Sequence, residues 1–276
     1  GATILTGRSV VDFNLDDGSV VGVVIDGEDG SRETIETEHV VNAAGPWVSE
    51  IASRIDLDIP VSPSKGAMAI TNSRPVDTVI NRCRPKGEGD ILVPHETTAI
   101  LGTTDRSIAG PESFEEDPEE IEFLIEQLSE MVPDLHQSRL IRTYWGVRPL
   151  YNVGRGESSV ETARDFVVLD HDTRDGLSGL TTVLGGKLST YRRMAEAVAD
   201  TVTEALEFDA PCRTAENPLP GSDGEVDFET VLEEYDLRSP IAARSTDRLG
   251  TRTEAVLESP GPNPVVCECE GVTAAE

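Results

Sequence analysis

The 276 residues are enough for one large domain or two smaller ones, and a hydrophobic content of 37% is ordinary for a globular protein. The 52 acidic residues against 23 basic ones give a formal net charge of −29, which disfavours nucleic acid and anionic membrane as direct partners. No apolar run approaches the roughly 20 residues of a membrane-spanning helix, so we expect no direct membrane span. The sequence shows no secretory signal and opens in strand-like residues without an initiator methionine, and we interpret it as a piece of a longer protein.

The basic residues include only three lysines, Lys65, Lys86 and Lys187. Scattered acid with scarce lysine is typical of proteins from a cytosol of molar salt, where the Debye length shrinks to about 3 Å. An ordinary acidic protein is the alternative, and it fits the scarcity of lysine less well. The remaining lysines are expected where a slim ammonium fits and a wide guanidinium does not. For Lys86 this expectation and chance retention are equally good readings.

The first fifty residues predict mainly β-structure. Strand-like runs cover residues 9–13, 19–25 and 34–37, with turn signals at 16–18 and 27–30. Residues 39–45 form an apolar run of small side chains that ends in Gly-Pro, which predicts a buried strand with a close neighbour. A short helix is expected over residues 47–54.

Between about residues 60 and 150 the pattern predicts mixed strands and one helix over 117–132. Asp117 supplies an N-cap, Pro118 the first helical position, and Glu120 an acid three residues on. Apolar side chains then recur on one face until Pro133, so we interpret this helix as scaffold that packs on a sheet.

The C-terminal part predicts one strand, three helices and a linker. The strand covers 166–169, and a helix with one apolar face follows Ser189. Prolines and glycines between 211 and 224 mark the linker, and helical stretches follow near 228–235 and 240–249.

Two of the four cysteines form a Cys-x-Cys pair, Cys267 and Cys269. Without a secretory signal, structural disulfides are not expected. The pair could supply half of an iron–sulfur ligand set, and such a cluster needs a second pair of thiolates. Because the sequence ends seven residues after the pair, we expect the partner thiolates outside it.

Three cationic positions are candidates for binding an anion. Arg148 precedes a proline, which favours extended backbone, and Arg164 stands at the entrance to the strand over 166–169. Lys187 follows Gly185 and Gly186, whose amides we expect to be unobstructed, just ahead of a helix N-terminus that attracts negative charge. Taken singly, each position has a structural reading that is at least as good: a surface salt bridge for either arginine, and a plain tight turn for the two glycines. No Gly-x-Ser-x-Gly elbow and no complete Gly-x-Gly-x-x-Gly fingerprint is present.

Seven ordered segments together carry a resemblance to a known family. They are VVNAAGPW, PSKGAM, NRCR with DILVP, LGTTD, WGVRPL, ARDFVVLDHD and GGKLSTYRRMAE, and CECEGVT follows near the end. In this order they resemble the FAD-dependent glycerol-3-phosphate dehydrogenases, and NRCR with DILVP and CECEGVT look most like the A-type subunit of the anaerobic, quinone-linked enzyme. The resemblance covers nearly the whole chain. It implies a Gly-x-Gly-x-x-Gly motif ahead of residue 1 and the rest of a [2Fe-2S] domain after residue 276.

The resemblance implies an α/β (α+β) fold of the D-amino-acid-oxidase type. A partial FAD-binding domain over residues 1–58 and 152–207 is expected to enclose an inserted substrate domain, a mixed β-sheet with one helix, over 59–151. A C-terminal helical extension is expected over 208–263, and the start of the [2Fe-2S] domain over 264–276. The implied cofactors are FAD and a [2Fe-2S] cluster whose ligand set, Cys267 and Cys269, is incomplete here.

The resemblance also implies the reaction and its site. The family oxidises sn-glycerol 3-phosphate to dihydroxyacetone phosphate. Arg148 and Arg164 match substrate-site positions for the phosphate, Lys65 is a further substrate ligand, and Lys187 is, with Arg148, a catalytic residue. The cofactor-binding residues implied are Asn42, Ala43, Ala44, Gly45, Pro46, Gly185, Gly186, Lys187 and Leu188. Aerobic relatives carry a histidine where this chain has Met68, so the general base is unidentified.

The implied partners are iron–sulfur and membrane-anchor subunits that pass electrons to quinone. This places the protein in the cytoplasm, peripherally at the inner face of the cell membrane. Two alternatives stay open: a flavin-dependent amino-acid or sarcosine oxidase, and a non-catalytic electron-transfer subunit on the same fold. The isolated piece is expected to be inactive.

Overall fold

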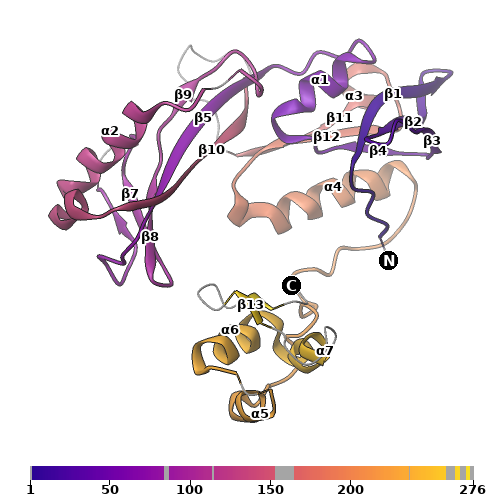
Figure 1. Ribbon diagram of the computed structural model, residues 1–276. Helices are drawn as coiled ribbons and strands as arrows, with labels where there is room; N and C mark the ends of the chain where they lie inside the picture. Colours follow the sequence, from indigo (N-terminus) through magenta and orange to yellow (C-terminus); the bar gives the residue numbers. More distant parts are fainter. Residues whose placement is uncertain are drawn as a thin grey trace. The chain divides into compact units, whose positions relative to one another are not determined.

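The computed structural model describes residues 2–83, 87–113, 115–152, 165–235, 237–258, 265–267 and 272–273. The chain divides into two compact units, Gly1–Ala210 and Pro211–Glu276. Figure 1 shows the elements of both. The division of the first unit into FAD and substrate domains stays a prediction.

The first unit opens with an antiparallel three-stranded sheet. Its strands are β1 (Arg8–Asp16), β2 (Ser19–Gly27) and β3 (Arg32–Glu36), paired in the order β1-β2-β3. The turn between β1 and β2 places Asp17 and Gly18 at positive φ, as a tight hairpin requires. Phe13, Val20 and Val23 are buried in one core with Leu180 of a later strand. The strands predicted over 9–13, 19–25 and 34–37 are confirmed.

A second small sheet combines two chain segments far apart in sequence. It has the order β11-β12-β4, from strands β11 (Phe166–Asp170), β12 (Leu180–Gly185) and β4 (Val40–Asn42). β11 pairs with β12 antiparallel, and β12 pairs with β4 parallel. The flanking helices are η1 (Gly45–Trp47), α1 (Val48–Ser53), α3 (His171–Asp175), η3 (Leu188–Thr190) and α4 (Tyr191–Ala205).

The buried strand predicted over residues 39–45 is wrong in one respect. The strand is shorter, and Val41 at its centre is 40% exposed. In the described part of the chain β4 pairs only with β12, so its other edge carries no strand. An apolar strand with small residues beyond it is therefore left at an edge.

The third sheet has six strands and a helix across it. The strands are β5 (Val61–Thr71), β6 (Ile80–Asn81), β7 (Ile91–His95), β8 (Thr98–Gly102), β9 (Arg106–Ser107) and β10 (Leu140–Tyr151). Their order is β10-β5-β8-β7-β6, and β9 also pairs with β5. All these pairings are antiparallel, so the predicted mixture of strand directions is found in the β11-β12-β4 sheet instead.

Helix α2 (Pro118–Ser129) covers the six-stranded sheet and η2 (Pro133–Gln137) follows it. The Asp117 carboxylate accepts a hydrogen bond of 3.0 Å from the amide of Glu119, which confirms the predicted N-cap. Leu124 and Leu128 are fully buried against Ala67, Leu92 and other sheet residues. At the other end of the sheet, Tyr151 of β10 packs against the core of the β11-β12-β4 sheet, so β10 joins the two (Figure 1).

The second unit is mainly helical in its described residues. Its elements are α5 (Phe228–Glu234), α6 (Ser239–Leu249), η4 (Gly250–Arg252), α7 (Thr253–Glu258) and the strand pair β13 (Val265–Cys267) and β14 (Val272–Thr273). Val231, Ala242 and Leu257 form a small core of their own. The helices predicted near 228–235 and 240–249 are confirmed.

Candidate functional site

Two of the predicted cofactor segments follow the carboxyl ends of neighbouring strands. β4 ends at Asn42 and β12 ends at Gly185, and the two strands are parallel, with Asn42 beside Thr182. Segments after the carboxyl ends of parallel strands meet at one edge of the sheet, which is where open α/β sheets bind their ligands. The structure therefore brings the segments 42–46 and 185–188 to the same edge.

The Asn42 side chain organises the first of these segments. It is buried, its amide nitrogen donates to the carbonyl of Val48 at 2.9 Å, and its carbonyl oxygen accepts from the amide of Ala44 at 3.3 Å. The chain then turns through Gly45, which has a φ of +56° and open space where a Cβ would be. Ala43 is exposed, so the backbone of this segment can be approached closely.

The second segment is a tight turn that only glycine fits. Gly185 and Gly186 have φ values of +78° and +75°, and an added Cβ would lie 2.7 Å from the carbonyl of Asp165 and 2.6 Å from Met194 Sδ, respectively. The expectation of unobstructed amides is wrong for Gly186, whose N–H donates to the Asp165 carbonyl at 3.3 Å. This bond closes the turn against the start of β11.

Lys187 begins a short helical turn at the same edge. Its own amide donates to the hydroxyl of Thr190 at 3.1 Å, which caps η3, and its side chain is exposed. Leu188 beside it is 89% exposed and Tyr191 is 63% exposed. In the described structure no residue of α4 is buried, although its apolar residues recur on one face as predicted. Lys187, Leu188 and Tyr191 are therefore all exposed to solvent at this edge of the sheet.

Arg148 lies on β10, in the extended backbone that the following proline predicts, beside Ser64 of β5. Its Nη2 donates to the hydroxyl of Thr103 at 3.0 Å and to the carbonyl of Thr104 at 3.1 Å. Its Nη1 donates to the hydroxyl of Ser64 at 3.4 Å and lies 3.8 Å from Asp105 Oδ1.

A pocket of about 270 Å³ opens at this arginine. Its lining includes Arg82, Asp90, Thr103, Asp105 and Arg148. Thr103, Thr104 and Asp105 belong to the segment LGTTD, and sequence reasoning used that segment only for the resemblance. The signal available for their role was this polar run directly after a buried strand.

Lys65 is placed differently from a typical substrate ligand. It is 6% exposed, its ammonium forms an ion pair with Glu120 of α2, and it donates to the carbonyl of Glu115 at 2.9 Å. Glu120 is 3% exposed. The assignment of Lys65 to the substrate stays a prediction, and the structure gives its ammonium a buried carboxylate within the chain.

Three predicted site residues lie partly or wholly outside the described residues. Arg164 and Cys269 lie outside the residues that the structure describes, and Cys267 is described only as the last residue of β13. In the described residues no group of three or more His, Cys, Asp and Glu side chains could hold a metal ion. No described helix is long and apolar enough to cross a membrane.

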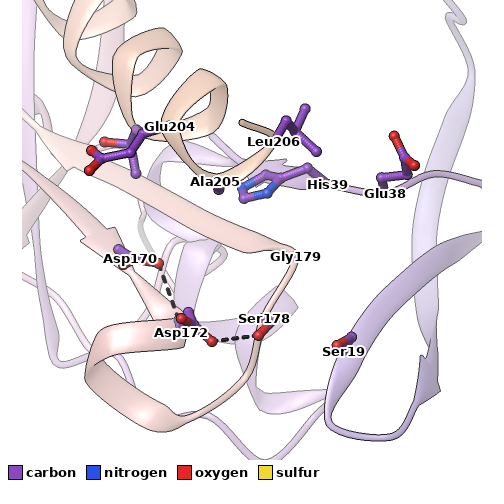
Figure 2. Close-up of a pocket in the computed structure, with 11 residues that line it drawn as sticks. Ser19, Glu38, His39, Asp170, Asp172, Ser178, Gly179, Glu204, Ala205 and Leu206 are labelled. Atoms are coloured by element: carbon purple, nitrogen blue, oxygen red, sulfur yellow. Dashed lines mark hydrogen bonds between the residues drawn. The ribbon is translucent and has the colours of Figure 1, made fainter. Parts of the chain in front are cut away.

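A second pocket, of about 380 Å³, lies at the opposite ends of the parallel strands (Figure 2). Glu38 and His39 stand just before β4, and Gly179 just before β12, so this is the amino end of both strands. His39 Nε2 lies 2.9 Å from the hydroxyl of Thr181, and burial lowers the pKa of His39 below its usual range against an opposing effect of Asp170.

This second pocket does not suit an anionic ligand. Glu38, Asp170, Asp172 and Glu204 line it with carboxylates. A hydrogen bond from the hydroxyl of Thr173 keeps the pKa of Asp170 below its usual range, so that carboxylate is ionised at neutral pH. This pocket therefore differs from the edge that carries Gly185 and Lys187 in two respects. It is lined by carboxylates, and it lies at the amino ends of the parallel strands, whereas that edge lies at their carboxyl ends.

Comparison with known proteins identifies the family of the chain. A family model described as FAD dependent oxidoreductase matches residues 1–192. The chain is 50% identical, over 288 aligned residues and its whole length, to the A1 subunit of the anaerobic glycerol-3-phosphate dehydrogenase of Haloferax volcanii, of which it covers 49%. It is 40% identical to the A-type subunit of the anaerobic glycerol-3-phosphate dehydrogenase of Haemophilus influenzae, again over the whole chain and 50% of that relative.

Among solved structures, the fold is similar to that of glycerol-3-phosphate dehydrogenase from Bacillus halodurans complexed with FAD. The TM-score is 0.72 at 24% identity, over 91% of this chain and 51% of that one. The predicted fold of the D-amino-acid-oxidase type is confirmed. The chain spans about half the length of the curated relatives it matches.

Proposed function

Because the chain belongs to the FAD dependent oxidoreductase family, we propose that it is part of a flavoenzyme that oxidises sn-glycerol 3-phosphate to dihydroxyacetone phosphate. The similarity to anaerobic glycerol-3-phosphate dehydrogenase subunits runs along the whole chain. The activity belongs to a longer protein, since the chain covers about half of each of these relatives.

The residues at the sheet edge fit a flavin. Asn42–Pro46 and Gly185–Leu188 would hold FAD, because Gly45 and exposed Ala43 leave their backbone open to close contact and Leu188 is available to cover an apolar surface. When bound, FAD would accept the hydride from C2 of the substrate.

The observation that carries the proposed substrate is the guanidinium of Arg148 beside a pocket. A phosphate dianion needs a fixed cation in a chain of net charge −29, and a planar fork binds phosphate oxygens in pairs. The side chain of Arg148 is 28% exposed, so part of the fork faces the pocket while the rest is held by Thr103 and Thr104. Arg164 is the proposed second phosphate ligand.

Lys187 is the proposed catalytic cation at the cofactor edge. It follows the glycine turn, and its exposed side chain starts from the N-terminus of η3. A slim ammonium there would attract both the substrate phosphate and negative charge at the cofactor without filling the space of the substrate.

The electron path is a further part of the proposal. Cys267 and Cys269 would supply half of the ligands of a [2Fe-2S] cluster, completed by thiolates outside this chain. Electrons would leave through iron–sulfur and membrane-anchor subunits to quinone, at the inner face of the cell membrane. The acid excess and the scarcity of lysine support a cytosol of molar salt as the source.

Anaerobic reduction of the flavin in the full-length protein tests the proposal. Glycerol 3-phosphate should bleach the flavin absorbance, and sarcosine or other amino acids should not. Reduction by an amino acid alone would favour the oxidase alternative. An oxidised flavin that no substrate reduces, but that accepts electrons from a partner protein, would favour the non-catalytic alternative.

A further inference from the structure

We propose that Gly66, Thr104 and Glu120 form a seat that fixes the guanidinium of Arg148, and that Thr104 is a positioning residue for the substrate phosphate. The inference rests on the proposed function, because it concerns how the same arginine meets its anion.

Gly66 provides the space in which the guanidinium lies. An added Cβ at this position would stand 2.3 Å from Arg148 Nη2 and 2.7 Å from the hydroxyl of Thr103. Gly66 has no positive φ, so the requirement for glycine here is one of space alone. The guanidinium therefore lies on the backbone of β5, where any other residue would displace it.

Thr104 supplies the fixed acceptor under the arginine. It is fully buried, and its carbonyl accepts from Arg148 Nη2. Its hydroxyl accepts from the amide of Ala67 at 2.8 Å and donates to Glu120 Oε1 at 2.6 Å, and its amide donates to the carbonyl of Ala67 at 3.4 Å. With both its backbone amide and its hydroxyl bound, Thr104 holds its carbonyl in one place.

Glu120 ties this seat to the helix that covers the sheet. It belongs to α2, and its second oxygen pairs with the ammonium of Lys65, one residue before Gly66. A buried carboxylate is favourable only when charged and hydrogen-bonded partners surround it. Lys65, Glu120, Thr104 and Ala67 thus form a closed ring of contacts on the side of β5 away from solvent.

Together with Ser64 and Thr103, the seat determines the orientation of the guanidinium plane. A guanidinium is planar, so contacts of Nη2 with Thr103 and Thr104 and of Nη1 with Ser64 fix its plane. Displacement of a substrate-holding group by about 1 Å can lower the rate by about 100-fold. Loss of the Thr104 hydroxyl should therefore weaken phosphate recognition while the arginine itself remains.

The experiment compares Thr104→Val, which removes the hydroxyl at nearly constant shape, with Thr104→Ser, which keeps it, in the full-length FAD-loaded enzyme. We expect Thr104→Val to lower kcat/KM for glycerol 3-phosphate about tenfold, mainly through KM, and to change kcat/KM for molar glycerol less than threefold. Thr104→Ser should stay within about threefold of the wild type for both. Equal losses for both substrates, no loss, or a serine variant as poor as valine would overturn the inference.

Two glycine variants decide the matter if Thr104→Val fails to fold. Gly66→Ala should lose glycerol 3-phosphate turnover selectively. Gly146→Ala is the matched control, because Gly146 faces Gly66 across β5 and β10 and its added Cβ would meet no described heavy atom within 4 Å. An equal effect of the two alanines would contradict the seat.

The wild type separates this inference from the proposed function. If glycerol 3-phosphate fails to reduce the wild-type flavin, the proposed function is wrong. The seat is then judged by calorimetric titration with inorganic phosphate, whose affinity Thr104→Val must lower and Thr104→Ser must retain. Unchanged phosphate affinity in both would overturn the seat as well.

Discussion

The six-stranded sheet and the β11-β12-β4 sheet differ in how far this chain alone completes them. In the first, α2 covers one face and buried Lys65 pairs with buried Glu120. In the second, β4 presents an open edge, Leu188 and Tyr191 are exposed, and α4 has no buried residue in the described structure.

The difference separates the two parts of the proposed site. The arginine that would bind phosphate has its supporting contacts within this sequence, at Ser64, Thr103 and Thr104. The residues that would bind FAD stand next to exposed apolar side chains, Leu188 and Tyr191. Substitutions in the six-stranded sheet should therefore change stability or substrate recognition directly. Those in the β11-β12-β4 sheet should act through the bound cofactor.

The largest expected effect is on stability, from Glu120→Ala. It leaves the ammonium of Lys65 buried without its carboxylate, which should destabilise the full-length protein by about 3–5 kcal/mol. Chemical denaturation measures this. The double variant Lys65→Met/Glu120→Leu should be close to the wild type, and exposed Glu119→Ala should change stability by less than about 0.5 kcal/mol. A single variant as stable as the double one would show that the pair does not hold α2 on the sheet.

The next effect is on catalysis, from Arg148→Met. Removing a charge-assisted contact worth about 1.5–3 kcal/mol should lower kcat/KM for glycerol 3-phosphate about 10- to 100-fold. The loss should be much smaller for glycerol, which has no phosphate. Arg142→Met is the control, because Arg142 is an exposed arginine of the same strand. Equal losses for both substrates would assign Arg148 a structural role.

A smaller effect is expected from Gly186→Ala in the second sheet. Alanine at a φ of +75° costs about 1–2 kcal/mol, and its Cβ would also press on Met194. The variant should lose FAD more readily on dilution, measured by flavin fluorescence. Gly30→Ala has a similar φ of +77° but open space around it, so it should share the backbone cost and retain FAD. Equal retention in both would separate the glycine turn from the cofactor.

The smallest effect on stability is expected from Lys187, whose exposed side chain packs in no core. Lys187→Met should leave the melting temperature nearly unchanged but shift the flavin midpoint potential to more negative values, because a positive charge favours the reduced cofactor. Lys187→Arg keeps the charge and should still lower turnover, since the fork is wider than the ammonium. Potential and turnover unchanged in molar salt would mark Lys187 as an ordinary surface residue.

The sequence by itself determined the local elements and the segments of the proposed site. Asp117 and Pro118 predicted the start of α2, because a capping carboxylate and a proline act within one turn. Gly185 and Gly186 marked a segment ahead of a helix, and the tight turn that was the alternative reading of this pair is what the structure has, since glycine adopts that backbone easily. The ordered motifs predicted the fold, which the family comparison confirmed.

Only the tertiary structure decided how distant residues meet. The seat of Arg148 depends on the register that places it beside Ser64, on the packing of α2 that brings Glu120 to Lys65, and on the bond that fixes Thr104 to Ala67. Register and helix packing are set by many cooperating contacts, so no single spacing predicts them. The sequence pattern also did not predict that Val41 of β4 is exposed or that α4 has no buried residue in the described structure. An apolar face shows that a residue can be buried, but it does not show what covers it.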